Sequence, residues 1–164
     1  MSAHDPSTVS VARRTDLLRG VFGGVASGLL GGIAWFLVVV GTSSMTTYFI
    51  PVIGFAAAYG VYVGMRRPGG AAALVSVFST AVSGALSLYY VERYLVVRWF
   101  TQAGDGLHIP LFPYLDWMGE VIGHAFAKGP GAPVYGLLAL VAAGWFGLRG
   151  FHDLRRSDHS GRPH

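Results

Sequence analysis

Residues 17–40 read LLRGVFGGVASGLLGGIAWFLVVV, and this stretch decides the fold. Glycine recurs at every fourth position, at Gly20, Gly24, Gly28 and Gly32, within an almost uninterrupted apolar segment. Residues four apart lie on one face of an α-helix, so these glycines form a groove without side chains. Such a helix is weak in water, whereas in lipid the groove lets another helix approach closely. The stretch therefore predicts a membrane helix with a helix partner.

The composition extends this prediction to the whole chain. Of the 164 residues, 52% are hydrophobic and 12% are charged, and the charged fraction is about half that of soluble domains. We expect one compact helical membrane domain without a separate soluble domain. Cysteine is absent, which excludes disulfides and thiolate metal sites. The formal net charge is +4, but the basic residues lie at the ends of apolar segments, so no nucleic-acid surface is expected.

Four apolar segments are long enough to cross a membrane. The predicted spans are residues 17–40, 48–65, 71–91 and 133–150. Residues 1–16 and 151–164 are polar, and we expect a disordered cytoplasmic tail at each end. The pair Arg13 and Arg14 is also compatible with a twin-arginine signal, but Asp16 and the length of the first span favour a membrane anchor. The predicted fold class is all-α, an integral membrane four-helix bundle.

The distribution of basic residues predicts the orientation. Most arginines flank the first span, the turn between the second and third spans, or the end of the fourth span. Only Arg93, Arg98 and Lys128 lie on the opposite side. Because cytoplasmic segments are enriched in Lys and Arg, both termini should be cytoplasmic and residues 92–132 extracytoplasmic. The glycine-, alanine- and arginine-rich composition indicates a bacterial source, and hence the inner cell membrane.

Small residues also line the other spans. Gly60 and Gly64 give the second span a surface that suits the glycine groove of the first span. Small-residue faces recur on all four spans, which is more than a self-contained four-helix bundle obviously needs. We therefore expect a non-enzymatic accessory or scaffold subunit that lies in the lipid bilayer and binds another membrane protein or a second copy of itself.

Hydroxyl side chains on the third span leave an alternative open. Ser76, Thr80, Ser83 and Ser87 are candidates to line a small homo-oligomeric channel or transporter for a small solute or ion. Hydroxyls in membrane helices also bond the carbonyl four residues back or a neighbouring helix. Helix packing is therefore the favoured interpretation of these residues.

The extracytoplasmic segment holds the best candidate for a polar or metal site. Asp116, Glu120 and His124 share one face of a short helix predicted over residues 114–127. Neighbours four apart suit a shared metal ion or an acid/base pair. Asp116 and His124, however, are separated by about 12 Å along the axis, so one ion cannot join all three. An amphipathic interfacial helix with this face in water is the favoured interpretation, and no cofactor is expected.

Glu92 and Arg93 are the acidic and basic residues nearest to the interior of a span. They follow about 21 apolar residues, where a helix reaches the headgroup region. An interfacial ion pair is therefore expected in preference to a proton relay. The other spans carry no acidic residue, histidine or lysine in their middle thirds. This pattern argues against an ion-coupled transporter, a haem-ligating subunit and an intramembrane protease.

Three short motifs carry a family resemblance. They are GGIAW at residues 31–35, VGMR at residues 63–66 and AAGWFGLR at residues 142–149. In these motifs the chain resembles a group of small uncharacterised bacterial four-span membrane proteins, whose glycine-rich first span contains a tryptophan. The resemblance covers residues 17–150 and implies the same topology. The group has no assigned activity, so the resemblance implies none for this chain.

Overall fold

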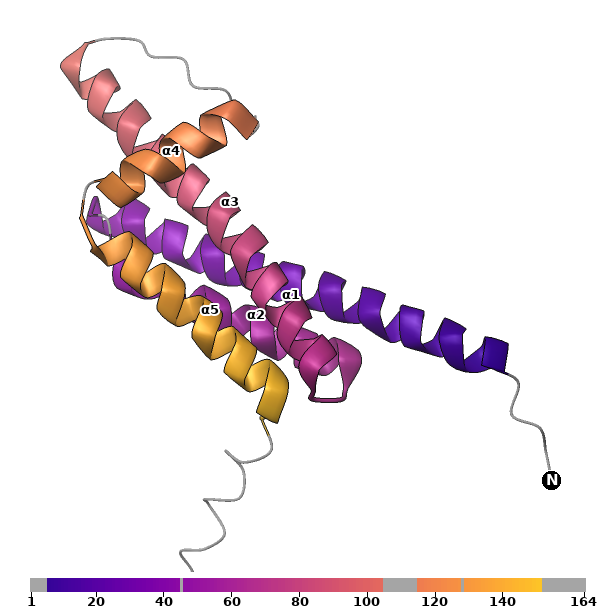
Figure 1. Ribbon diagram of the computed structural model, residues 1–164. Coiled ribbons are helices and arrows are strands. Elements are labelled where there is room, and N and C mark those ends of the chain that lie inside the picture. The colour runs from indigo at the N-terminus through magenta and orange to yellow at the C-terminus, as the bar shows by residue number, and fades with distance from the viewer. Residues whose placement is uncertain (1–5, 45, 105–114, 128, 152–164) are drawn as a thin grey trace, which may run out of the picture.

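The computed structural model describes residues 6–44, 46–104, 115–127 and 129–151 (Figure 1). For residues 6–13, 103, 115–117 and 121 it describes the backbone only. This part of the chain is helical and contains no strand. The elements are α1 (Pro6–Thr42), the short 3-10 helix η1 (Thr47–Phe49), α2 (Ile50–Met65), α3 (Gly70–Ala103), α4 (Leu115–Ala127) and α5 (Gly131–Arg149).

Four segments are long and apolar enough to cross a membrane. They are Arg14–Thr42, Thr47–Met65, Gly70–Gln102 and Gly131–Arg149. The all-helical prediction and the four apolar segments are thereby confirmed. The four segments indicate a multi-pass membrane protein.

The helices α2 and α3 lie at the centre of the arrangement. α1 packs against both of them from one side, and α5 packs against both from the other side. α4 contacts α3 and α5 and lies across one end of the bundle (Figure 1). We call this the α4 end. The α2–α3 turn and the last turn of α5 meet at the opposite end, where Gly69 N donates a 3.0 Å hydrogen bond to Gly147 O.

α1 and α3 are both longer than the sequence analysis predicted. α1 begins at Pro6, so the backbone of residues 6–16 is helical where we expected a disordered tail. Proline suits the first helical position, and no glycine follows it before Gly20. α3 continues to Ala103, 12 residues beyond the predicted span of residues 71–91. It ends at Gly104, whose φ of 87° is the left-handed conformation that commonly terminates helices.

The core has two apolar clusters separated by a layer of small residues. The cluster nearer the α4 end is built around Trp35, whose side chain is 1% exposed. Its other buried members are Val39, Ile50, Ile53, Leu88, Val91, Ala125 and Ala139. The second cluster, towards the opposite end, consists of Val61, Ala72 and Val75. Between them α1 meets its neighbours through glycine, alanine and serine, which allows the close approach typical of membrane helices.

Candidate functional site

The predicted glycine groove of α1 is filled by serines of α3. A methyl group built on Gly24 would lie 2.6 Å from Ser79 Oγ, and one on Gly28 would lie 2.5 Å from Ser83 Oγ. Gly32 faces Ser87 in the same way. Each serine lies 55 positions after its glycine, so α1 and α3 run parallel in one constant register. We call these three pairs the glycine–serine seam.

The adjacent face of α1 meets α2 with the backbones in contact. Gly23 and Gly60 face each other so closely that a methyl group on either would strike the carbonyl oxygen of the other. A methyl group on Gly64 would lie 2.5 Å from the carbonyl oxygen of Arg19. Gly20 faces the side chain of Met65. Two neighbouring faces of α1 are thus occupied by helices of the same chain.

The hydroxyl residues proposed as a pore lining are buried within a single chain. Ser76, Ser83, Ser87 and Thr80 are each at most 7% exposed. Ser83 donates a 3.3 Å hydrogen bond to Val25 O of α1, and Ser87 donates a 2.6 Å bond to Ser83 O. A pore between copies would need these hydroxyls on an outer face of the bundle. In this conformation Ser83 and Ser87 hydrogen-bond within the bundle, and the channel alternative stays a prediction.

Glu92 and Arg93 occupy different environments. The Glu92 side chain is 1% exposed, whereas Arg93 is half-buried. Successive residues point about 100° apart around a helix, so the two side chains leave α3 in different directions. The predicted ion pair between them stays a prediction. The burial of a carboxylate on the same helix as the serines was not expected from the sequence.

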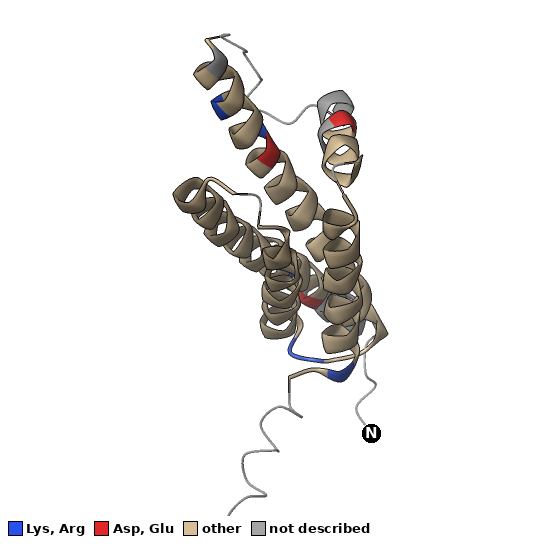
Figure 2. Cartoon of the chain, turned by 90° about the vertical axis from the view of Figure 1, so that its left-hand side faces the viewer, with Lys and Arg blue, Asp and Glu red and all other residues tan. Residues whose placement is uncertain are grey.

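Arg98 ties the end of α1 to α3. Its Nη1 donates hydrogen bonds to Ser43 Oγ, at 2.5 Å, and to Tyr94 OH, at 3.1 Å. The Tyr94 ring packs edge-on against Phe36 of α1, with ring centroids 5.5 Å apart. The contact of Arg98 with Ser43 was not predictable, because residues 55 positions apart carry no local signal of contact. The charges of α3 and α4 lie near the α4 end, and the basic turn between α2 and α3 lies at the other end (Figure 2).

The polar face of α4 is exposed. Glu120 and His124 are both exposed, whereas Ala125 is buried against α3 and its neighbours. The side chain of Asp116 lies outside the part that the structure describes. Among the described residues, no three His, Asp or Glu side chains come together as a group that could hold a metal ion. The arrangement of the described α4 residues is amphipathic, with the apolar face towards the bundle.

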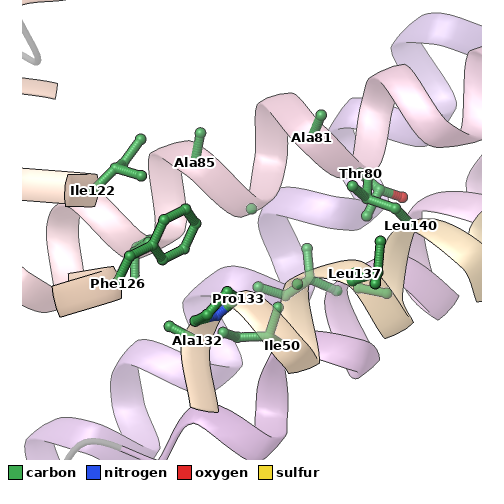
Figure 3. A pocket seen from close by; sticks show the side chains of 15 residues that line it. Ile50, Thr80, Ala81, Ala85, Ile122, Phe126, Ala132, Pro133, Leu137 and Leu140 are labelled. Atoms are coloured by element: carbon green, nitrogen blue, oxygen red, sulfur yellow. The ribbon is translucent and has the colours of Figure 1, made fainter. Parts of the chain in front are cut away.

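A cavity of about 340 Å³ lies between α3 and α5 at the α4 end (Figure 3). Ala81 and Ala85 of α3 form one wall, and Pro133 and Leu137 of α5 form the other. Phe126 of α4 closes the end. The lining is almost entirely apolar, and the volume is within the range of small-molecule sites. Sequence analysis did not predict this cavity.

An aromatic cluster anchors the chain after α5. Phe151 stacks on Phe146 with centroids 5.0 Å apart, and it meets the edges of three further rings. Those rings belong to Phe55, Tyr59 and Tyr62 of α2. In the last turn of α5, Arg149 Cζ lies 4.0 Å from the centre of the Trp145 ring. Aromatic and basic side chains of this kind mark the interface between membrane and water.

Comparison with known proteins adds no relative to this picture. No protein-family model, curated protein or solved structure matches the chain.

Proposed function

We propose that the chain is a non-enzymatic accessory or scaffold subunit of a membrane assembly. In this proposal it is a four-span bundle of a bacterial inner membrane, with both termini cytoplasmic and α4 as an extracytoplasmic interfacial helix. The observation that supports a binding role is the length of α1. This helix extends beyond every other helix at the end of the bundle opposite α4 (Figure 1).

The register of the glycine–serine seam measures this extension. Because α3 lies 55 positions ahead of α1, its first residue, Gly70, is level with Thr15. α2 ends at Met65, beside Gly20, so it reaches no further. Residues 6–14 of α1 therefore project past both neighbours, over about 13 Å at 1.5 Å per residue. We call this segment the α1 projection.

The α1 projection continues the packed part of α1, so it needs no nucleus of its own. Helix ends nevertheless fray unless something packs against them. At the base of the projection, Leu18 and Phe22 are 59% and 75% exposed, so an apolar surface continues from the span towards it. A partner helix or domain docked at this end would cover both features. The glycine faces of α1, in contrast, already pack against α2 and α3.

The distribution of charge supports the cytoplasmic assignment of this end. Arg14 and Arg19 are exposed on α1 beside Arg66 and Arg67 of the α2–α3 turn and Arg149 of α5. Basic residues are enriched on the cytoplasmic side of membrane proteins. A cytoplasmic partner, or the cytoplasmic part of another membrane subunit, is therefore the partner that suits the α1 projection.

The test compares Val11→Pro with Val11→Ala in particles extracted gently from native membrane. Proline inside the projection breaks its helix, whereas alanine keeps it. We expect the wild-type chain and Val11→Ala to retain one partner in fixed stoichiometry, either another protein or a second copy. Val11→Pro should release that partner while the bundle keeps its thermal stability. A wild-type particle with the mass of one chain plus lipid, or full retention by Val11→Pro, would contradict the proposal.

A further inference from the structure

The cavity arises because α5 stays in contact with α2 but separates from α3 towards the α4 end. At the end opposite α4, α5 touches α3, and a methyl group on Gly147 would lie 2.5 Å from Ala73 Cα. Towards the α4 end it touches α2, where a methyl group on Gly54 would lie 2.6 Å from Ala139 O. α3 and α5 therefore diverge, and a wedge-shaped gap opens between them. α4 closes the wide end of this wedge (Figure 3).

Two glycines face the gap with nothing opposite them. Gly84 of α3 and Gly136 of α5 both line the cavity, and a methyl group on either would meet no atom within 4 Å. This differs from the glycine–serine seam, where every glycine is in contact. The two open glycines lie at the same level, because each is 11 residues from the Ala73–Gly147 contact of these antiparallel helices. We call the space between them the slot.

The chemistry of the lining excludes water as a stable occupant. A buried water needs two to four polar partners. Thr80 is the hydroxyl residue in the lining, and the other lining side chains are apolar. An apolar cavity of about 150 Å³ can hold benzene. This cavity, at about 340 Å³, has room for a longer hydrocarbon.

The position of the cavity indicates what the hydrocarbon is. Its walls belong to three of the four membrane-crossing segments, so it opens at the level of the lipid chains. Leu137 and Phe126 in its lining are 64% and 47% exposed, which makes the cavity continuous with the lipid-facing surface. A transmembrane helix cannot lie in it, because the Gly147–Ala73 contact closes one end and α4 closes the other.

We infer that the slot between α3 and α5 binds one acyl chain of a membrane phospholipid. The unbranched chain enters from the bilayer between Gly84 and Gly136 and lies in the gap between α3 and α5. This inference is independent of the proposed subunit role, since the α1 projection lies at the other end of the bundle. A variant whose side chains block the slot leaves the α1 projection unchanged.

Gly84→Leu combined with Gly136→Leu fills the slot, and the Cβ atom of each new side chain meets no atom within 4 Å. Both new side chains enter open space, and leucine is the better helix former. Gly123→Leu on α4 is the matched control, because that glycine is exposed, has no atom within 4 Å of an added methyl group and does not line the cavity. Thermal unfolding verifies that all variants are at least as stable as the wild type.

The readout is photolabelling in phosphatidylcholine nanodiscs that contain a phospholipid with a diazirine at the end of one acyl chain. Mass spectrometry then locates the modified residues. We expect labelling of Leu88 and Leu140 in the wild type and in Gly123→Leu. In the double variant this label should fall by at least about tenfold, equivalent to about 1.4 kcal/mol of binding. Labelling of the exposed Leu30 on α1 should stay the same in all three.

A second measurement needs no variant. As the probe fraction rises, labelling of the slot should saturate, whereas labelling of Leu30 should rise linearly. Linear labelling at both places would overturn the inference, as would equal slot labelling in the wild type and the double variant. Displacement of the phospholipid probe by an isoprenoid chain, or crosslinking of the slot to a second copy, would assign another occupant and would also overturn it.

Discussion

α3 packs against α1 on one side and α5 on the other, with glycines at both contacts. The two contacts differ in how closely the helices approach each other. Towards α1, three glycines meet three serines in constant register, and a cavity of about 310 Å³ opens beside the last pair, between Phe36 of α1 and Leu86 of α3. Towards α5, contact at Gly147 gives way to the gap between Gly84 and Gly136. The same residue type thus marks a close approach on one side and a void on the other. A glycine in a membrane helix indicates where another group can come near, not that one does.

The difference follows from helix direction. α1 stays parallel to α3 through three successive pairs, so each glycine finds a serine at the same level. α5 keeps its contact with α2, at Gly54 and in the Phe55–Phe146 pair, but separates from α3 beyond the close Gly147 contact. Substitutions of glycines packed against α1 and of glycines facing the gap between α3 and α5 should therefore differ in their effect on stability.

Gly60→Leu should have the largest effect, because Gly60 of α2 lies where the backbones of α1 and α2 are in contact. The side chain would strike the carbonyl oxygen of Gly23, and a backbone atom cannot move aside as a side chain can. We expect a loss of more than about 3 kcal/mol in the free energy of unfolding, the upper end for overpacked cores. Gly41→Leu is the control, since a methyl group on Gly41 would meet no atom within 4 Å. Unfolding in SDS titrations measures both; equal stability of the two variants would contradict the α1–α2 contact.

Gly28→Ala should cost about 1–3 kcal/mol, because its methyl group overlaps the Ser83 side chain. Ser83→Gly removes the overlapping atoms, so the double variant should recover much of the loss. A double-mutant cycle should give a coupling energy of about 0.5–3 kcal/mol. The control cycle pairs Gly41→Ala with Ser83→Gly and should be additive. Additivity in both cycles would mean that α1 and α3 do not meet at this register.

Gly84→Ala and Gly136→Ala, in the gap between α3 and α5, should raise stability instead of lowering it. Each methyl group enters empty space, and alanine restricts the unfolded chain more than glycine does. We expect each variant to be more stable by about 0.4–1 kcal/mol in the same titration. Destabilisation comparable to that of Gly28→Ala would show that the slot is closed in the membrane.

Two serines of the seam should differ by a small amount. Ser83 donates a hydrogen bond to Val25 O, and Ser79 Oγ has no hydrogen-bond partner in the part of the chain that the structure describes. Ser83→Ala should therefore lose about 0.6 kcal/mol, the usual value for hydrogen bonds between membrane helices. Ser79→Ala should be neutral or slightly stabilising, because it removes an unsatisfied buried hydroxyl. The reverse order would place the interhelical hydrogen bond at Ser79.

The helices themselves were largely predictable. The four apolar segments and the short helix of residues 114–127 correspond to helices of the structure. The exceptions are α1, whose described helix begins earlier than predicted, at Pro6, and α3, which runs on through polar residues to the cap at Gly104. Apolar length predicts how much of a helix suits the membrane, whereas helix propensity decides where it ends.

The contacts between helices were much less predictable. The glycines of residues 17–40 indicated a groove, but not that Ser79, Ser83 and Ser87 fill it. The hydrogen bond from Arg98 to Ser43 also joins positions far apart in the sequence. The burial of Glu92 likewise depends on packing between helices. Such pairs depend on the relative rotation and height of two helices, which no local pattern in one chain specifies.

The sequence by itself determined how many helices are long and apolar enough to cross a membrane, their apolar surfaces and the turns between them. Those properties depend on local hydrogen bonding and on the transfer of about twenty consecutive residues into lipid. Only the tertiary structure decided which glycines are filled and which face a void. That outcome depends on the direction of α5 relative to α3, because two helices that cross at an angle stay in contact only near the crossing.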